Sequence, residues 1–369
     1  MREFNALSDF GLGWLEGSGP HAGIVLSTRV RLARNLQGHK FNTRTRDAER
    51  EQILERVRQA AEQTAVRGGL HFDLHSLSPI SRKVLLERHL VSRELAGLGG
   101  DAPARGAGLL VGPRDALSVM VNEEDHLRVQ ALMSGLCVRE SYKRADQLDE
   151  ELGALLPFAY HHEWGFLTSC PTNVGTGLRG SILIHLPALV LTKEIGRVLQ
   201  GIGQVGLTFR GLFGEGSEVV GNFFQISNQT TLGKSEEDLI EHLEKIVLRV
   251  IEYELGARDV LMRDAPAVIE DKIWRAYGLL RYARALSFEE VMNLLSGVRL
   301  GVSMNLIKGL RVYTLNKLMI YAQDAHLEQA AERPLSTAES DLHRAEYVRR
   351  VLASEGEVSP DAGPSAPAS

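Results

Sequence analysis

Several stretches of the chain alternate between apolar and polar residues with a period of two, the pattern of a β-strand with one buried face. The clearest is LSTRVRL at 26–32, and similar patterns occur in LSVMVNEE at 117–124, RGSILIHL at 179–186 and GLTFR at 206–210. In the second stretch we expect Asn122 and Glu124 to share one side. The alternation therefore predicts four strands, each of which presents Arg or Glu on a polar face.

Other segments have the spacing of amphipathic helices. DAEREQILERVRQAAEQ at 47–63 places its apolar residues three and four apart, and SEEDLIEHLEKIVLRVIEYEL at 235–255 opens with Ser235 as an N-cap before an acidic first turn. From about residue 260 onward the pattern is helical only, in 271–286, in 287–300 with a capping box of Ser287 and Glu290, and in 336–352. We find no convincing strand in this last part of the chain.

The change of pattern predicts an α+β fold, in which a largely antiparallel sheet flanked by helices is followed by an all-helical C-terminal domain. We expect an N-terminal segment at 1–23, a catalytic domain at 24–256 and a helical domain at 257–352. Residues 353–369 are polar and rich in proline, which is typical of a disordered tail.

Composition narrows the class of protein. The 369 residues are 44% apolar and 24% charged, which is ordinary for a soluble protein, and a net charge of −5 argues against binding to bulk nucleic acid. The two cysteines imply no disulfide framework. There is no apolar leader segment, and the longest apolar run, SILIHLPALVL, is broken by His185 and Pro187. We expect a cytoplasmic protein with no membrane association.

Two short motifs look like nucleotide-binding loops but fail on context. GTGLRG at 175–180 is followed by a strand-like segment, whereas a dinucleotide fingerprint opens a helix. LGKS at 232–235 resembles the end of a P-loop, but Asn228 stands where the first glycine is needed. The HRD and DFG signatures of common protein kinases are absent too. If a nucleotide binds, side chains must hold it.

Arginines from distant parts of the chain lie on or beside the predicted strands. A single arginine of this kind is usually a solvated surface charge. The whole set, together with Glu124 and Glu215, favours a site for a polyanion next to a site for a cation. The five arginines are Arg29, Arg31, Arg128, Arg179 and Arg210.

Four ordered stretches, VLSTRVRLARN, NEEDHLR, CPTNVGTGLRGS and RGLFGEGSE, resemble the motifs of the ATP:guanido phosphotransferases, the phosphagen kinase family. ISNQTTLGKSEEDLIEHL and the helical C-terminus are similar to the McsB-type protein-arginine kinases within that family, and the resemblance covers roughly residues 24–352. It implies ATP as phosphate donor, with Mg²⁺ held mainly through the nucleotide. The nucleotide contacts that it implies are Ser27, Thr28, Arg29, Val30, Arg31, His89, Arg128, Arg179, Gly180, Ser181, Ile182, Leu183, Arg210, Gly211, Leu212, Phe213, Gly214 and Glu215.

The same resemblance implies that the cation is a guanidinium group. A guanidinium has a pKa above about 12, so a neutral guanidine at pH 7 costs on the order of 7 kcal/mol or more, and a carboxylate cannot deprotonate it in advance. Carboxylates can instead orient the group and accept its proton as the N–P bond forms. By similarity Glu124 is the base, Glu215 a second carboxylate that holds the substrate, and Cys170 a cysteine beside the guanidinium.

The remaining polar residues of these stretches have simpler explanations. Cys170 could also be a small core residue, and Cys137, His126 and His185 are best explained by packing. Glu123 and Asp125 could orient Arg128 or neighbouring loops.

The nature of the acceptor stays open at this point. Family members that act on free arginine or creatine have a helical domain ahead of the SxRxR motif, and here Ser27 lies so near the start that we expect none. An open site suits an arginine of a protein. The alternatives are a kinase for a free guanidino metabolite and a non-catalytic adaptor that binds phosphoarginine. A sheet that binds nucleic acid is disfavoured, because its polar faces lack interleaved aromatic residues.

The resemblance also implies partners and regulation. SDLHRA at 340–345 matches an allosteric phosphoarginine-binding motif at Asp341, Arg344 and Ala345, with Ser340 where the family has arginine. A serine supplies one donor where an arginine supplies a charged fork, so a plain surface helix is an equal alternative. Implied partners are a zinc-binding activator protein, a heat-shock repressor and a Clp-type unfoldase, with a role in stress response and a homodimeric assembly.

Overall fold

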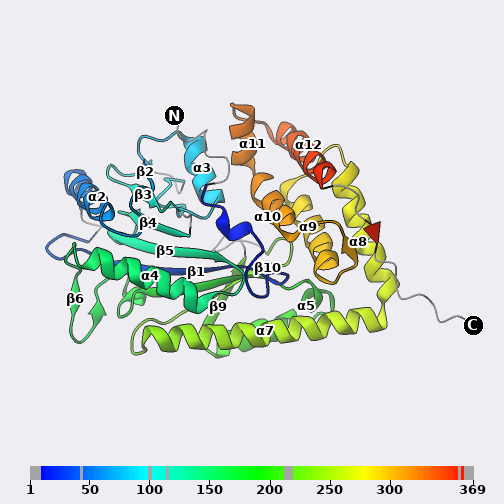
Figure 1. The fold of residues 1–369 in the computed structure, drawn as a ribbon, viewed down its shortest axis with the longest axis horizontal. Coiled ribbons are helices and arrows are strands. Elements are labelled where there is room, and N and C mark those ends of the chain that lie inside the picture. The colour runs from blue at the N-terminus through cyan, green and yellow to red at the C-terminus, as the bar shows by residue number, and fades with distance from the viewer. Residues whose placement is uncertain are drawn as a thin grey trace, which may run out of the picture.

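An eight-stranded antiparallel sheet forms the centre of the protein in this computed structural model, which describes residues 10–41, 45–98, 102–113, 116–211, 219–355 and 359–360 (Figure 1). Its strand order is β2-β3-β4-β5-β1-β8-β10-β9. The strands are β1 (Val25–Arg34), β2 (Leu70–Asp73), β3 (Gly108–Val111), β4 (Leu117–Val121), β5 (Leu127–Ser134), β8 (Leu178–His185), β9 (Leu207–Gly211) and β10 (Phe223–Asn228).

The four strands predicted from alternation are β1, β4, β8 and β9. The sequence pattern missed β2, β3, β5 and β10. The predicted α+β fold class is confirmed. Outside the sheet, β6 (Tyr160–His161) pairs with β7 (Gly165–Phe166), and β11 (Ile307–Lys308) pairs with β12 (Ser359–Pro360). This last pair corrects the expectation that no strand follows residue 260, and it places part of the predicted tail in an ordered pairing.

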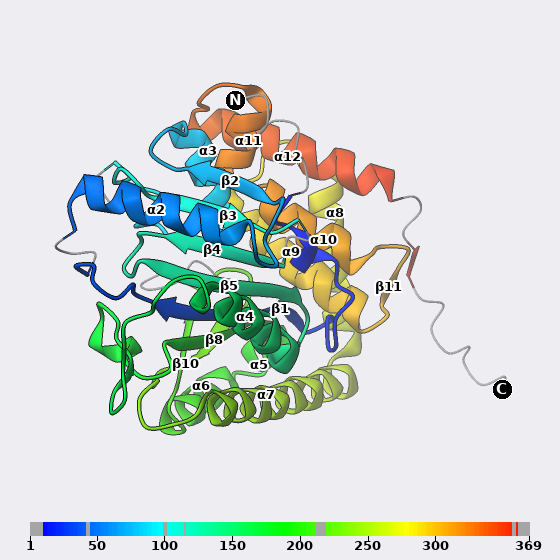
Figure 2. The ribbon, with the colours of Figure 1, turned by 60° about the vertical axis from the view of Figure 1, so that its left-hand side comes forward.

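Three helices cover the apolar face of the sheet: α2 (Asp47–Ala61), α4 (Val138–Gly153) and α7 (Glu236–Asp264) (Figure 2). Val30 and Leu32 of β1 are fully buried in this core. Each helix contributes an apolar stripe, as amphipathic spacing requires. Burial of this face fixes which side chains of each strand must point the other way.

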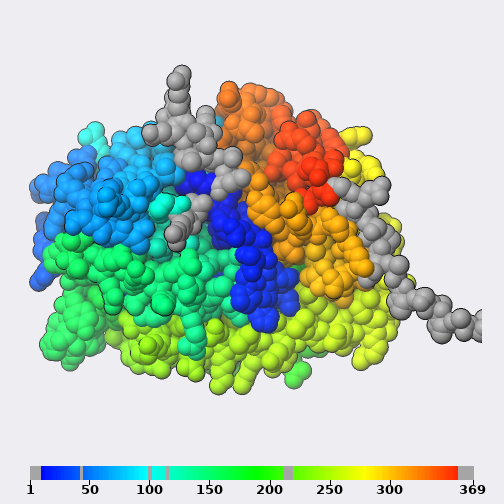
Figure 3. Space-filling model, viewed as in Figure 1, coloured from blue at the N-terminus to red at the C-terminus, as the bar shows by residue number. Residues whose placement is uncertain are grey.

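The C-terminal helices pack beside one end of the opposite face. They are α8 (Pro266–Tyr282), α9 (Phe288–Ser303), α10 (Val312–Tyr321), α11 (Asp324–Ala331) and α12 (Thr337–Ser354). A short 3-10 helix, η1 (Gly13–Leu15), contacts β1, β5 and α10, and Figure 3 shows the blue N-terminal segment between the sheet and the orange helices. The other helices are α3 (Pro79–Glu87), α5 (Pro187–Leu191), α6 (Ile195–Gln204) and the 3-10 helix η3 (Pro171–Asn173).

The domain boundary predicted at 256–257 falls inside α7, which runs unbroken to Asp264 before Pro266 starts α8. The apolar core beneath α2, α4 and α7 contains residues up to Ala257. Leu261 packs against this core and also against the separate core of the C-terminal helices. Ordered structure continues beyond residue 352, since α12 ends at Ser354 and Glu355 forms an ion pair with Arg311 at 3.0 Å. Among the described residues, none of the helices combines the length and apolar character needed to cross a bilayer.

Candidate functional site

Strand register brings the five predicted arginines onto the face of the sheet opposite α4 and α7. In β1, Arg31 is paired with Arg179 of β8 on one side and with Gln130 of β5 on the other. Arg128 lies two residues before Gln130, and Arg210 of β9 is paired with Gln225 of β10. Because side chains alternate between faces, register alone places Arg29, Arg31, Arg128, Arg179 and Arg210 on one surface.

In the absence of a bound anion, gathering these positive charges costs the folded protein electrostatic free energy. Burial and the nearby positive charges of Arg179 and Arg128 lower the pKa of Arg29 to about 10. Burial, followed by the charges of Arg29 and its neighbours, holds the pKa of Arg31 well below its ordinary value. The Nε of Arg31 is buried without a hydrogen-bond partner. Like charges gathered in this way, with an unsatisfied donor, are suited to an anion that carries several negative charges.

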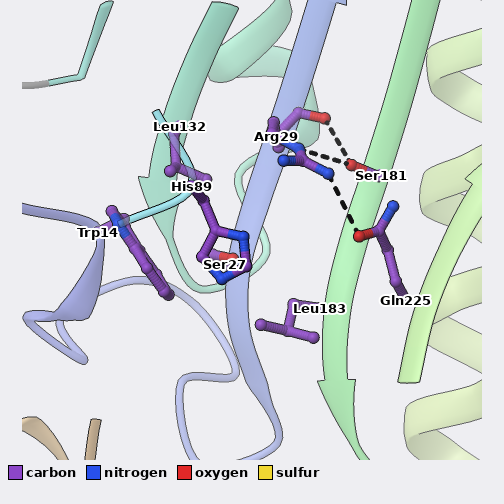
Figure 4. Close-up of a pocket in the computed structure, with 8 residues that line it drawn as sticks. All are labelled: Trp14, Ser27, Arg29, His89, Leu132, Ser181, Leu183 and Gln225. Atoms are coloured by element: carbon purple, nitrogen blue, oxygen red, sulfur yellow. Dashed lines mark hydrogen bonds between the residues drawn. The ribbon is translucent and has the colours of Figure 1, made fainter. Parts of the chain in front are cut away.

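A pocket opens around Arg29 (Figure 4). The Nε of Arg29 donates to the Oγ of Ser181 at 3.4 Å, and its second terminal nitrogen donates to the Oε1 of Gln225 at 3.2 Å. About 290 Å³ of space in and above this pocket is free of protein atoms, and part of that space is open solvent. Its other lining residues are Trp14, Ser27, His89, Leu132 and Leu183.

His89 stands at the edge of this pocket in an unusual backbone conformation, with φ 60°. Burial and the charge of Arg29 lower its pKa to about 3, so the ring is neutral at pH 7. Its Nε2 is buried without a partner in the structure, and the ring lies edge-on to Trp14 at 5.4 Å. A neutral imidazole with one unused nitrogen can take part in a hydrogen bond to a ligand.

The helix before His89 is held by the C-terminal domain. Glu87 accepts hydrogen bonds from the backbone nitrogens of Ala325 and His326 at 2.9 and 3.1 Å and from the Nδ1 of His326 at 2.6 Å. Arg88 donates to the Nε2 of His326 at 3.2 Å, which fixes the neutral tautomer of that ring. The C-terminal helices therefore help to position the residue that borders the pocket.

The three consecutive acids form the hairpin loop between β4 and β5. Asn122, expected at the end of a strand, instead has φ 58° and starts the turn, and its backbone nitrogen donates to the carbonyl oxygen of His126 at 2.8 Å. Arg128 donates to Glu123 at 2.8 Å and to Glu124 at 3.1 Å. The cation against these carboxylates in the structure is thus Arg128 itself.

Glu123 and Glu124 have different environments. The Glu123 side chain is 4% exposed and fixes Arg128, as predicted for an orienting residue, whereas that of Glu124 is 44% exposed. Partial burial, together with the charges of Asp125 and Glu123, raises the pKa of Glu124, and Arg128 opposes this shift. A half-exposed carboxylate with increased proton affinity is suited to bind a cation and accept its proton.

Asp125 and His126 are buried structural residues. Asp125 Oδ1 accepts from the amide of Asn35 at 2.7 Å and from the backbone nitrogen of Ser169 at 2.6 Å. His126 accepts from the backbone nitrogen of Leu36 at 3.0 Å, so its Nε2 donates to the carbonyl oxygen of Lys40 at 2.9 Å. These bonds fasten the acidic loop to the segments on either side of it.

Cys170 follows this connection by one residue, and its sulfur lies 3.0 Å from the Oγ1 of Thr172. The link from Ser169 to Asp125 places Cys170 near the acidic loop, on the partly exposed start of η3. Cys137 lies between β5 and α4, at the N-cap position of α4. Burial raises the pKa of its thiol. Because Cys170 is partly exposed, it is not a buried core residue.

Not all of the predicted nucleotide contacts have side chains on the arginine-bearing face of the sheet. The side chains of Thr28, Val30 and Ile182 point to the opposite face: Val30 and Ile182 are fully buried in the core under α4 and α7, and Thr28 bonds the carbonyl oxygen of Gly135 at 2.7 Å. A Cβ at Gly180 would meet Leu243 of α7 at 2.8 Å. The stretch RGLFGEGSE leaves only Arg210 and Gly211 in β9, because Leu212, Phe213, Gly214 and Glu215 lie outside the described residues.

Sequence reasoning also missed residues of this face. Gln225 and Ser227 of β10 point toward it, and FFQISN has an alternation that could have revealed them. No sequence signal identifies Trp14. The rejected motifs have structural roles: GTGLRG leads into a strand, and Ser235 of LGKS caps α7 in a capping box with Asp238.

SDLHRA lies in α12, where Ser340 and Ala345 are buried. Arg344 is 2% exposed and donates to the carbonyl oxygens of Ala322 and Leu286 at 2.7 and 2.8 Å. It also pairs with Asp341 at 2.6 Å and with Asp324, so its guanidinium joins α12 to the start of α11. These contacts favour the structural interpretation of this motif.

Comparisons with known proteins show the family to which the chain is related. The family model "ATP:guanido phosphotransferase, C-terminal catalytic domain" matches residues 51–257, and the model "Protein-arginine kinase McsB C-terminal domain" matches residues 266–362. The chain is 45% identical to a protein-arginine kinase of Moorella thermoacetica over 92% of its own length and 97% of the relative. It is 43% identical to a protein-arginine kinase of Bacillus cereus over 93% and 96%.

Among solved structures, the chain is similar to the duplicated taurocyamine kinase from Schistosoma mansoni with bound transition state analog components. The TM-score is 0.58 at 29% sequence identity, and the match covers 65% of this chain and 34% of that one.

Proposed function

Because the chain belongs to the ATP:guanido phosphotransferase family, and within it to the group of the protein-arginine kinases, we propose that it transfers the γ-phosphate of ATP to arginine side chains of proteins. The observation that supports this function best is the register of the sheet. It brings the arginines of β1, β5, β8 and β9 onto one face of the sheet, and Arg128 of this set bonds Glu124 at 3.1 Å. We infer that the arginines bind the triphosphate and that Glu124 lies on the acceptor side.

The arginine face suits the donor half of the reaction. A triphosphate carries about four negative charges, and guanidinium groups bind phosphate oxygens through paired hydrogen bonds. Burial and then repulsion between the arginines lower the pKa of Arg29 and Arg31, and the negative charge of bound ATP would offset both effects. The same charges stabilise the phosphoryl group during transfer, when negative charge is spread over its oxygens.

Magnesium fits this face without a protein cage. The described residues contain no group of three or more His, Cys, Asp or Glu side chains able to hold a metal ion. Mg²⁺ typically keeps several waters and takes phosphate oxygens as ligands, so the nucleotide itself would be its principal ligand. When bound, it would neutralise part of the negative charge of the triphosphate.

The acceptor half is centred on Glu124. A guanidino nitrogen attacks the γ-phosphorus, the bond from that phosphorus to the bridging oxygen of ADP breaks, and the nitrogen loses one proton. Glu124 is placed to orient the guanidinium and receive that proton, since its raised pKa favours the protonated form. Glu123 keeps Arg128 in place while the substrate shares Glu124 with it. On family resemblance, Glu215 is proposed as the second carboxylate and Cys170 as a neighbour of the guanidinium.

The biological setting is proposed on family resemblance alone. It comprises marking of proteins for a Clp-type unfoldase, a zinc-binding activator, a heat-shock repressor among the substrates, stress response, a homodimer, allosteric control and a place in the cytoplasm. For allosteric phosphoarginine binding at 340–345, the contacts of Arg344 speak for a role in helix packing instead.

Two acceptors and one variant test the function. Wild-type protein is incubated with Mg·ATP and either casein or free arginine, and acid-labile phosphate is measured. We expect transfer to casein; transfer to free arginine alone would indicate a metabolite kinase, and binding of phosphoarginine with no transfer would indicate an adaptor.

Glu124→Ala is expected to abolish transfer while ATP still binds, because the carboxylate serves the acceptor and not the nucleotide. Glu237→Ala, on the exposed side of α7, is the matched control and should transfer as the wild type does. Unchanged turnover of Glu124→Ala would refute its assignment as the base.

A further inference from the structure

An exposed aromatic hairpin stands beside the acidic loop, and the function proposed so far gives it no role. This aromatic hairpin, residues 160–166, is formed by β6 and β7, at the left-hand end of the molecule in Figure 1. Tyr160 is 61% exposed and Trp164 is 49% exposed, and Leu155 next to the hairpin is 40% exposed. Large apolar side chains gathered at the border of a site commonly mark a binding surface.

The base of the aromatic hairpin is fastened to the acidic loop. Asn35 and Asp125 are 1% and 0% exposed and bond each other at 2.7 Å. The same amide of Asn35 donates to the carbonyl oxygen of Leu167 at 3.1 Å, and Asp125 accepts from Ser169 at 2.6 Å. Since Asp125 follows Glu124 directly, one buried connection sets the position of the hairpin relative to the proposed base.

Internal packing leaves the two outer aromatic residues outside the core. The guanidinium of Arg34 stacks over the Phe166 ring, 3.5 Å from the ring centroid. Tyr160 lies edge-on to Phe166 at 5.3 Å and still presents most of its surface to solvent. Trp164 lies in the connection between β6 and β7, exposes about half of its surface and belongs to none of the apolar clusters of the described residues.

The distance to Glu124 fits a short peptide. Five extended residues span at most about 18 Å, so the chain from Ser169 to Trp164 cannot place the hairpin tip farther than this from the acidic loop connection. If the target arginine of a substrate reaches Glu124, about eight further residues of extended substrate chain are enough to reach Trp164. Exposed Glu163 adds a negative charge that favours basic segments.

Resting on the function proposed above, we propose that the aromatic hairpin binds the unfolded polypeptide that flanks the target arginine. Trp and Tyr provide large, rigid contact surfaces that can pack against many different side chains of a bound polypeptide. The hairpin thus distinguishes an arginine within a polypeptide from a free guanidino compound by contacts that the latter cannot make.

The test measures phosphorylation of two added acceptor substrates by the full-length protein. One is an unstructured peptide with a single arginine and eight residues on either side, and the other is N-acetylarginine amide. For Trp164→Ala we expect kcat/KM for the long peptide to fall about tenfold, with no change for the small acceptor or in the KM for ATP. Tyr160→Ala should show the same selective loss.

Tyr282→Ala is the matched control, because Tyr282 is 72% exposed at the end of α8, and it should leave both acceptors unchanged. Equal kcat/KM of Trp164→Ala and wild type on the long peptide would overturn the proposal. An equal loss on both acceptors would overturn it too, since the hairpin would then act on the catalytic groups. If the wild type phosphorylates the small acceptor but not the peptide, the proposed function itself fails.

Discussion

Replacing Arg29 by methionine should stabilise the fold and remove the response to ATP. Burial, followed by the charges of Arg179 and Arg128, lowers the pKa of Arg29 from its ordinary value to about 10. A shift of this size corresponds to roughly 3 kcal/mol at about 1.4 kcal/mol per pKa unit. Because water reaches part of the side chain, about 2 kcal/mol is a reasonable cost of holding this charge in the folded state.

The sign of this effect follows from linkage. The pKa of Arg29 is lower in the folded protein than in the unfolded chain, so the charged guanidinium destabilises the fold at every pH below about 10. The cost is therefore present in full at pH 7 and disappears only as the pH rises above about 10 toward the ordinary pKa of an arginine side chain. Methionine keeps an unbranched apolar side chain of similar length and removes the charge.

The variant also loses two hydrogen bonds, to Ser181 at 3.4 Å and to Gln225 at 3.2 Å. At these lengths each contributes about 0.5 kcal/mol, the low end for such bonds. Arg29→Met should thus raise the free energy of unfolding by about 1 kcal/mol without nucleotide. Wild type should gain about 2.7 kcal/mol at a Mg·ATP concentration of 100 Kd, and the variant less than about 1 kcal/mol at that concentration.

Urea unfolding at pH 7, with and without Mg·ATP, measures both effects. Arg34→Met is the control on the same strand: Arg34 is 2% exposed, pairs with Asp149 at 2.8 Å and donates to the carbonyl oxygens of Ala33 and Thr176. Removing one partner of this buried pair should cost about 3–5 kcal/mol. If Arg29→Met destabilises the protein as Arg34→Met does, Arg29 is a structural residue and the interpretation of the arginine face is refuted.

Three further predictions concern other contacts. Glu87→Gln weakens the hold of α11 on α3, so the KM for ATP should rise several-fold while the KM for casein stays unchanged, because His89 borders the pocket proposed for the nucleotide. Arg344→Met should lower the free energy of unfolding by about 3–5 kcal/mol in thermal or urea denaturation, since it leaves buried carbonyl groups without a donor. Since burial raises the pKa of Glu124, kcat/KM for casein should fall with decreasing pH through a midpoint above the ordinary glutamate range, and a midpoint below that range would contradict its role as base.

Much of the site follows from local pattern, because a strand with one buried face must present its other residues to the opposite side. Alternation in LSTRVRL and RGSILIHL correctly placed Arg29, Arg31 and Arg179 away from the core. The pattern could not reveal that β1 lies between β5 and β8, since strand order depends on contacts between residues far apart in the sequence. That these arginines meet is therefore a result of the fold.

The acidic loop shows the opposite case. Three acids at the end of a strand-like run suggested an extended Glu124, but Asn122 adopts a left-handed conformation and turns the chain into a hairpin. The sequence could indicate that a cation faces these acids, yet only the structure identifies Arg128 as one that does. Similarly, the tertiary contacts that engage Arg344 are invisible in a helical pattern.

The bond that carries the transferred phosphate is the most direct test of the central claim. After incubation of the protein with Mg·ATP and casein, ³¹P NMR of the modified casein should show a phosphorus bound to a guanidino nitrogen, with one ADP formed for each phosphate attached and the signal lost in acid. An acid-stable phosphate ester on serine, threonine or tyrosine, or ADP release with no phosphate on casein, would contradict it.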